Sequence, residues 1–382
     1  MRRYWHIIVL GCWTLACFSR FAPHGGFSWH YFTLGSAVLF GGAPTDGLHI
    51  YAHYPQLQIG PVAFIVAQVL RQLGPHQGVF VTEALLTALG LYVLHELTRI
   101  ALLVRPDLAW RPIALRVTVL VGGAAFLAGW TELATTFTHL DDVLALTLSL
   151  LAVRAAVEER PVLVGLFVGL AADSKPWALV FLPIVLTLPF QSWGRAAASA
   201  LVTVAAAWLP FVIADPNTIT AAHYTIGNLS GSALRALGVS TPRTPPWDRM
   251  AQLLIGWALA AACVARRRWP AVILLGVGAR IALDPADHGY YTAGVLLGAL
   301  LWDLTGMKVP IPLWTATSYV ALSAVHFLTK DPALLGALRL GLVVAFTAVI
   351  LLSPPWRRRW RPKHAKHARP LVIPRMEQPV QT

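Results

Sequence analysis

Apolar runs recur along this chain from one end to the other, and most hold about fifteen to twenty residues, which is enough or nearly enough for a helix that spans a membrane. One soluble core could not bury this much apolar surface, because 57% of the 382 residues are hydrophobic, only 12% are charged and the mean hydropathy is +0.62. Within hydrocarbon, the backbone polar groups of such a run must be paired inside its own helix. The sequence therefore predicts an all-α, polytopic transmembrane helical bundle.

Basic residues set the expected topology. The formal net charge is +13, and most arginines stand in short clusters at the ends of apolar runs, as they do when they are retained on the cytoplasmic side. We interpret the charge as a topology signal and expect no nucleic-acid partner. With both termini in the cytoplasm, the clusters predict a multi-pass protein of the plasma membrane with about twelve spans. These spans lie near residues 5–20, 79–97, 117–135, 143–157, 161–174, 176–190, 196–213, 250–265, 269–284, 289–304, 309–327 and 333–353.

The segments outside the spans differ in length. The first apolar run suits a signal peptide as well as a span, but no A-x-A cleavage site follows it, so an uncleaved helix is predicted. Residues 21–78 then form a long extracytoplasmic loop. Its stretch from Ile59 to Leu70 holds only about a dozen apolar residues and is expected to lie on the outer leaflet as a surface helix. Residues 1–355 make up the membrane domain, and residues 356–382 a basic, disordered cytoplasmic tail that touches anionic lipid headgroups.

The stretch His139-Leu140-Asp141-Asp142 places two carboxylates where one apolar run ends and another begins. Acids at membrane depth are usually paired, exposed to a wet cavity or functional, because a bare carboxylate is costly in hydrocarbon. Two acids at a helix start also cap its amide groups and suit its dipole, so a structural role for one of them stays open. We expect the other acid to face an aqueous site.

Acids and histidines gather in the segments that this topology places outside, whereas cations are sparse there. Such a face suits proton transfer on a phosphorylated substrate, although loops are polar in any membrane protein. The first outer loop adds an aromatic run with Trp29 and His30, and then a second element, Tyr51 to Pro55, which contains His53 and Tyr54. Tyrosine and tryptophan prefer the membrane interface, so we expect this loop to form a substrate-facing shelf on the bilayer.

Three elements, in this order, resemble the GT-C membrane glycosyltransferases and, within them, the actinobacterial polyprenyl-phosphate-dependent α-mannosyltransferase group. They are the long outer loop with its two aromatic elements, the glycine-spaced run from Gly165 to Lys175, and the element from Asp284 to Tyr291. The resemblance covers residues 1–300. It implies a GT-C-like bundle that moves a sugar, with inversion, from a polyprenyl-phosphate donor to an envelope glycolipid or glycan acceptor on the outer face. The implied sugar is mannose, with arabinofuranose as the nearest competitor, and no cofactor or metal is implied.

One position departs from this resemblance. The family's base is an aspartate two residues before the histidine of the first outer loop, and this chain has Ser28 there. A serine cannot accept a proton at neutral pH without a base of its own. The candidate catalytic acids are therefore Asp46, Asp141 and Asp142. Carboxylate oxygens of this kind would also suit magnesium or manganese, but no metal is expected.

The leaving phosphate needs a cation. Lys175 is the first candidate, although a lysine at the end of an apolar helix can also snorkel to lipid headgroups, and Arg243 and Arg280 are further candidates. The candidate substrate-binding residues are Trp29, His30, His53, Tyr54, His139, His288 and Tyr290. Tyrosine rings of this kind can stack on a sugar or simply belong to an interfacial belt.

The expected partners are the lipid-linked sugar, its acceptor and membrane lipids. Two other functions stay open: a non-catalytic polyprenyl-phosphate-binding or scaffold relative, and a lipid or solute transporter, although the two halves show no convincing internal repeat.

Overall fold

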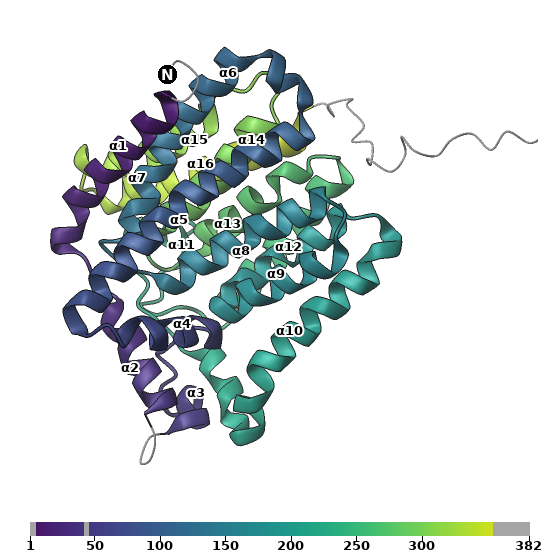
Figure 1. Cartoon of the computed structure of the whole chain (residues 1–382). Helices are drawn as coiled ribbons and strands as arrows, with labels where there is room; N and C mark the ends of the chain where they lie inside the picture. Colours follow the sequence, from purple (N-terminus) through teal and green to yellow (C-terminus); the bar gives the residue numbers. More distant parts are fainter. Residues whose placement is uncertain (1–4, 42–45, 354–382) are drawn as a thin grey trace, which may run out of the picture.

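The computed structural model describes residues 5–41 and 46–353, and the predicted basic tail lies outside these residues. Within them every regular element is helical and no strand forms (Figure 1). The all-α prediction is therefore confirmed.

The fold consists of α-helices joined by short 3-10 segments and one π-helical turn, within the described residues. The α-helices are α1 (Trp5–Phe21), α2 (Trp29–Phe40), α3 (Ile50–His53), α4 (Pro61–Arg71), α5 (Pro75–Val104), α6 (Pro112–Val117), α7 (Gly123–Ala134), α8 (Leu140–Val157), α9 (Pro161–Ser174), α10 (Trp193–Ala214), α11 (Ala233–Ala236), α12 (Asp248–Ala265), α13 (Val272–Leu283), α14 (Thr292–Thr305), α15 (Leu313–Leu322) and α16 (Pro332–Leu352). Shorter 3-10 segments are η1 (Ala22–His24), η2 (Gly47–His49), η3 (Pro106–Trp110), η5 (Pro176–Thr187), η6 (Phe190–Ser192), η7 (Pro216–His223), η8 (Trp269–Ala271), η9 (Gly289–Tyr291) and η10 (Ala324–Phe327), and η4 (Thr118–Gly122) is a π-helical turn.

Within residues 5–41 and 46–353, six helical segments are long and apolar enough to cross a membrane. They are Trp5–His24, Pro75–Val104, Pro112–Ala134, Phe190–Ala214, Asp248–Ala265 and Pro332–Leu352. The first and fourth bury only 17% of their most apolar window, and side chains such as Leu15 and Ile213 point away from the protein. Apolar helix faces left uncovered in this way suit contact with lipid. These helices support the prediction of a membrane protein, and every predicted span coincides with a helical stretch, while the count of twelve stays a prediction.

The glycine-spaced helix α9 packs closely against α10. A Cβ atom on Gly165 would lie 2.1 Å from the carbonyl oxygen of Ala196, and one on Gly169 would lie 2.6 Å from Cβ of Thr203. Small residues four apart let two helix backbones approach closely, as in packed membrane helices. The glycine spacing of this run therefore serves helix packing in this chain.

After α9 the chain enters η5, a 3-10 segment where a span was expected. Pro176 opens it and Pro183 lies inside it. Proline has no backbone N–H and clashes with the preceding turn, so it disfavours regular α-helix at both places. This segment packs against α8, α9 and α12, which keeps its first residues beside the start of α8.

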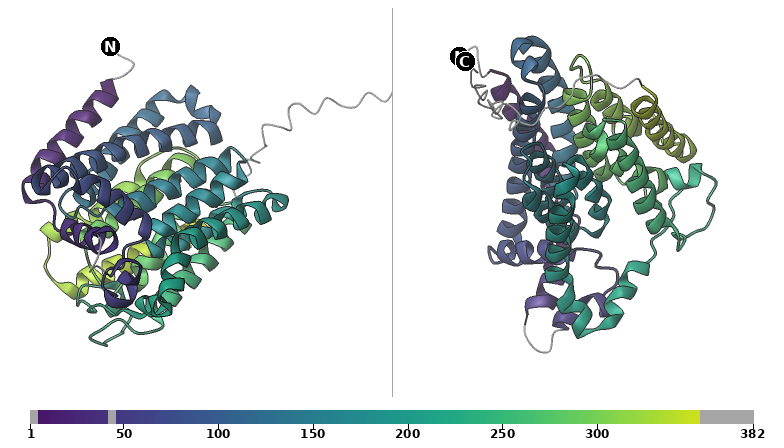
Figure 2. Two further views of the ribbon diagram at one scale, coloured as in Figure 1. Left: turned by 60° about the horizontal axis from the view of Figure 1, so that its bottom comes forward. Right: turned by 90° about the vertical axis from the view of Figure 1, so that its right-hand side faces the viewer.

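Contacts at the two ends of the bundle join different groups of helix ends. At one end, residues of the predicted cytoplasmic segments meet: Arg154 pairs with Glu96, and Arg105 donates to the carbonyl of Met307. At the other end, α2, α3 and α4 gather beside the last residues of α10 (Figures 1 and 2). The sorting agrees with the order of alternating spans that the basic clusters predict.

The predicted surface helix is α4, which has eleven residues and is too short to span a bilayer. Its Phe64 is fully buried, whereas Ile65 and Val69 on the other face are exposed. The chain enters it at Gly60, whose N–H donates to the carbonyl of Ser174 at the end of α9. The first loop is thus attached directly to the segment that carries Lys175.

Candidate active site

A backbone frame brings the first loop to the start of α8. The N–H groups of Gly26, Phe27 and Ser28 donate to the carbonyls of residues 135, 136 and 137 at 3.0–3.2 Å. The next residue, Thr138, has a φ of +48°, which is unusual for a residue with a side chain. Its hydroxyl accepts from Gly26 N–H and donates to Glu83 Oε1, so the turn is held from two sides.

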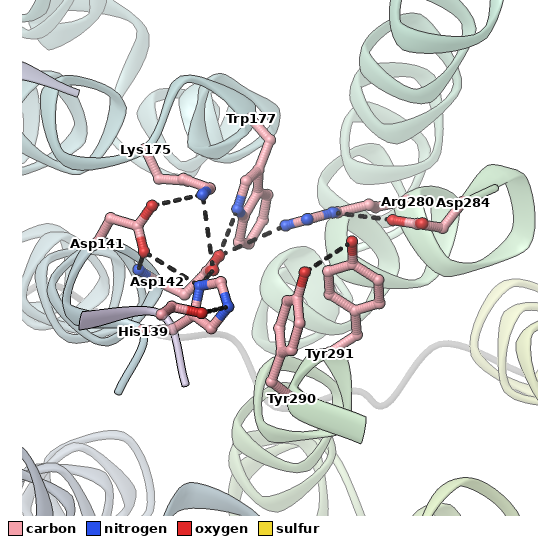
Figure 3. A network of polar contacts seen from close by, with 10 residues as sticks. His139, Asp141, Asp142, Lys175, Trp177, Arg280, Asp284, Tyr290 and Tyr291 are labelled. Carbon is pink, nitrogen blue, oxygen red and sulfur yellow. Dashed lines mark hydrogen bonds and ion pairs between the residues drawn. The ribbon is translucent and has the colours of Figure 1, made fainter. Parts of the chain in front are cut away.

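This frame positions His139 between a hydroxyl and two carboxylates (Figure 3). His139 Nε2 is hydrogen-bonded to Ser28 Oγ at 3.1 Å. Its Nδ1 lies 3.2 Å from Asp142 Oδ2 and 3.4 Å from Asp141 Oδ1. The sequence run His139 to Asp142 thus converges on one point, because it forms the N-cap and first turn of α8.

Two cations flank the carboxylates. Lys175, which follows α9, forms an ion pair with Asp141 and lies 4.0 Å from Asp142 Oδ2. Arg280, in the last turn of α13, lies 3.7 Å from Asp142 Oδ1 and pairs with Asp284 at 3.4 Å. We call His139, Asp141, Asp142, Lys175, Arg280 and Asp284 the charge cluster.

Aromatic rings surround the charge cluster. Trp177 donates from Nε1 to Asp142 Oδ1 at 2.7 Å. The guanidinium of Arg280 lies 4.1 Å from the Trp177 ring and 4.5 Å from the Tyr291 ring, so it sits between two π faces. Tyr290 stacks on His139 with ring centroids 4.1 Å apart. These contacts hold the cations and the histidine in fixed orientations.

A small pocket, with room for about one water molecule, adjoins this arrangement. It is lined by Asp142, Trp177, Arg280, Tyr290 and Tyr291, together with apolar side chains of α8 and α13. Asp142 Oδ2 is buried beside this pocket and lies 3.2 Å from His139 Nδ1. A buried carboxylate oxygen beside a pocket can accept a proton or a hydrogen bond from a molecule that enters.

Charge balance within the cluster depends on His139. Three carboxylates face two fixed cations, so the cluster is neutral when His139 is protonated. Burial lowers the pKa of His139, but its contacts with Asp141 and Asp142 outweigh burial and raise the pKa above its ordinary value. The site therefore holds exchangeable protons in a region sheltered from water.

The structure brings together only part of the predicted site. Among the described residues, no hydrogen bond, ion pair or ring contact joins the following predicted residues to the charge cluster: Asp46, Trp29, His30, His53, Tyr54 and Arg243. Asp46 instead pairs with His53 at 3.1 Å, and Trp29 is buried against Phe32. His288 is exposed and stacks on Tyr290, which places it at the edge of the site.

Several functional contacts were not predicted. Trp177 received no role, although it follows Lys175 by two residues and so leaves α9 at the same corner. Ser28 was noted only as a departure from the resemblance, yet it contacts His139. Asp284 stood in the third element of the resemblance without a role, and Tyr291 was considered only for stacking on a sugar; both contact Arg280.

A metal is a poor fit for the charge cluster. His139, Asp141 and Asp142 offer ligand atoms within 4.8 Å of one another. Lys175 and Trp177, however, already engage the two carboxylates, and a lysine ammonium beside them repels a divalent cation. The arrangement instead suits binding of a substrate anion together with proton transfer.

Comparison with known proteins provides no relative, because no family model, curated protein or solved structure matches this chain. Function is therefore argued from the charge cluster and its surroundings. The cluster combines potential proton acceptors, two cations and stacked rings at one end of a bundle of apolar helices.

Proposed function

We propose that this chain is an integral-membrane glycosyltransferase that moves a sugar, with mannose as the first candidate, from a polyprenyl-phosphate donor to an envelope lipid or glycan. The proposal includes a GT-C-like bundle of about twelve spans whose charge cluster faces the extracytoplasmic side. The observation that carries it is Asp142, a buried carboxylate beside His139 that is flanked by Lys175 and Arg280 at a pocket lined by aromatic rings.

The two cations are the proposed phosphate site. Arg280 presents a planar guanidinium held between Trp177 and Tyr291, and Lys175 presents a point charge on the other side of Asp142. Guanidinium and ammonium groups are the usual protein partners of phosphate oxygens. Both now pair with carboxylates, so an entering phosphate has to compete with Asp142 for them.

That competition connects donor binding to base strength. While Lys175 and Arg280 lie close to Asp142, they stabilise its ionised form and make it a weak base. When a phosphate takes these cations, the carboxylate loses that stabilisation and becomes a stronger base. The donor phosphate thus activates Asp142 only in the loaded site.

The reaction then has a balanced course. Asp142 accepts the proton of the acceptor hydroxyl, the hydroxyl oxygen forms a bond to the anomeric carbon, and the bond between that carbon and the phosphate oxygen breaks. Its electron pair leaves with the polyprenyl phosphate, which Lys175 and Arg280 hold. His139, hydrogen-bonded to Ser28 and next to Asp142, serves as the group that passes the proton onward.

The experiment is transfer from radiolabelled polyprenyl-phosphate mannose in membranes that contain wild type or a variant. Asp142→Asn is expected to lower turnover by about 10²–10⁴-fold, the usual contribution of a general base. Asp331→Asn is the matched control, because Asp331 is an exposed acid that caps α16 and asparagine caps equally well.

Three outcomes overturn parts of the proposal. Loss of turnover in Asp46→Asn with retention in Asp142→Asn would move the base to Asp46. Donor binding without turnover in the wild type would favour a scaffold relative. Uptake of a labelled solute into vesicles that requires the charge cluster would favour a transporter, since buried charge networks also serve in transport.

A further inference from the structure

A second cluster of ionisable side chains lies outside the charge cluster, where the first loop meets the end of α10. His49 Nδ1 lies 3.3 Å from Asp215 Oδ2, and His53 Nδ1 lies 3.1 Å from Asp46 Oδ1. The rings of His49 and His53 stack with centroids 5.7 Å apart. These four residues are used by no step of the proposed transfer.

Their placement comes from two separate parts of the chain. His49 and His53 are four residues apart, which puts both rings on one face of the short helical stretch formed by η2 and α3. Asp215 is the residue at the junction of α10 and η7, and its Oδ1 is fixed by the N–H of Asn217. The stretch packs against α10 and η7, so the fold itself brings the carboxylate to the histidines.

Ion pairing alone gives such a group little stability. Both histidines are exposed, and exposed ion pairs add little to the stability of a fold. The donor set is more informative than the pairs: one nitrogen from each of two histidines and one carboxylate oxygen lie within 4.8 Å of one another. Two histidines and a carboxylate are a common ligand set for zinc, with an open fourth position.

The spacing of these atoms is close to what zinc requires. In a tetrahedral site with bonds of about 2.0–2.1 Å, neighbouring ligand atoms lie about 3.3 Å apart. The pair formed by His49 and Asp215 is already at 3.3 Å, and the exposed side chain of His53 can close the remaining gap by rotation.

We propose that His49, His53 and Asp215 form a zinc site that fastens the first loop to the end of α10. Asp46 acts as a positioning residue, because its contact with the His53 ring is the kind of bond with which carboxylates orient metal-bound histidines. Imidazole nitrogens favour zinc over magnesium or calcium, which prefer an all-oxygen site. The site is separate from the charge cluster and does not rest on the glycosyltransferase proposal.

The test uses the untagged full chain in detergent, with zinc titrated against a fluorescent chelator. Wild type is expected to bind one zinc ion per chain, and His49→Ala/His53→Ala is expected to lose that ion. Asp46→Asn is expected to weaken binding by about 10–100-fold, the usual effect of removing an orienting carboxylate. His76→Gln is the matched control, because His76 is an exposed histidine in the first turn of α5, outside the group.

A second measurement tests whether zinc holds the first loop against the end of α10. Amide hydrogen exchange over residues 46–58 is expected to slow when zinc is added to wild type and to stay unchanged in the double variant. The proposal is overturned if wild type binds no zinc, if the double variant binds it with wild-type affinity, or if excess magnesium displaces it. Zinc that binds wild type with no change in exchange would overturn the fastening role.

Discussion

The ion pair between Lys175 and Asp141 provides the sharpest test of how the charge cluster is held together. Asp141 is fully buried, and Lys175 is its nearest cation. In Lys175→Met, Asp141 keeps the contact with His139 at 3.4 Å and the hydrogen bond from the N–H of Asp142 at 2.9 Å, but it loses its nearest cation and lies beside the ionised Asp142. Removing one partner of a buried pair costs about 3–5 kcal/mol, because the other charge stays buried without compensation.

The reverse substitution is expected to cost less. In Asp141→Asn, the Lys175 ammonium remains 4.0 Å from Asp142 and is partly exposed to solvent. We therefore expect Asp141→Asn to lower the free energy of unfolding by about 1–3 kcal/mol, the range for a buried polar group that loses one partner. The double variant Lys175→Met/Asp141→Asn removes both charges together. Its loss of unfolding free energy should therefore lie close to that of Asp141→Asn alone and well below the sum of the two single losses.

These free energies of unfolding are measured by SDS titration of the purified protein in mixed micelles, with helicity as the signal. Lys308→Met is the matched control, because Lys308 is an exposed lysine at the other end of the bundle. The reasoning is refuted if Lys175→Met lies within about 1 kcal/mol of wild type. It is also refuted if the two single losses are equal and add in the double variant, because additive losses mean that the two groups do not interact.

Two further predictions test the frame around the site. Gly60→Ala places a Cβ atom 2.0 Å from the carbonyl oxygen of Asp173 and should destabilise the protein by about 1–3 kcal/mol in the same titration, whereas Gly341→Ala, which meets nothing within 4 Å, should not. The raised pKa of His139 means that its pairing contributes stability below the ordinary histidine pKa of about 6.5 and loses it as the pH rises through the folded-state pKa. The stability deficit of His139→Asn should therefore be larger at acidic than at alkaline pH, and a deficit independent of pH would contradict this.

The fold class was predictable because it depends on a property that the sequence displays directly. Long apolar runs force internally hydrogen-bonded helices. The helix type and the packing partner of each element were harder to predict from the sequence. The expected span at 176–190 is a 3-10 segment whose course depends on Pro176 and Pro183 as well as on packing against three helices. The sequence shows the glycines of α9, but it does not show that α10 is the helix that packs against them.

For the site, the sequence could identify residues but not their distances. Asp141, Asp142 and His139 are neighbours in the chain, so their proximity was predictable from a helix start alone. Lys175 lies 34 residues after Asp141 in the sequence, and Arg280 lies on another helix, α13. Only the alternation of spans suggests that these residues share an end of the bundle. Asp46 is close to the first aromatic run in sequence, but the structure pairs it with His53 in the second cluster instead.

Ser28 occupies the position where the resemblance stated from the sequence leads us to expect an aspartate. The backbone bonds of residues 26–28 place this buried serine against His139, so position 28 does lie at the charge cluster. An aspartate there would add a fourth carboxylate to a group with only two fixed cations, and burying that charge without a partner is costly. A hydroxyl avoids this cost and still holds His139 in place. In this chain Asp142, rather than position 28, is thus the carboxylate that the site can accommodate next to both cations.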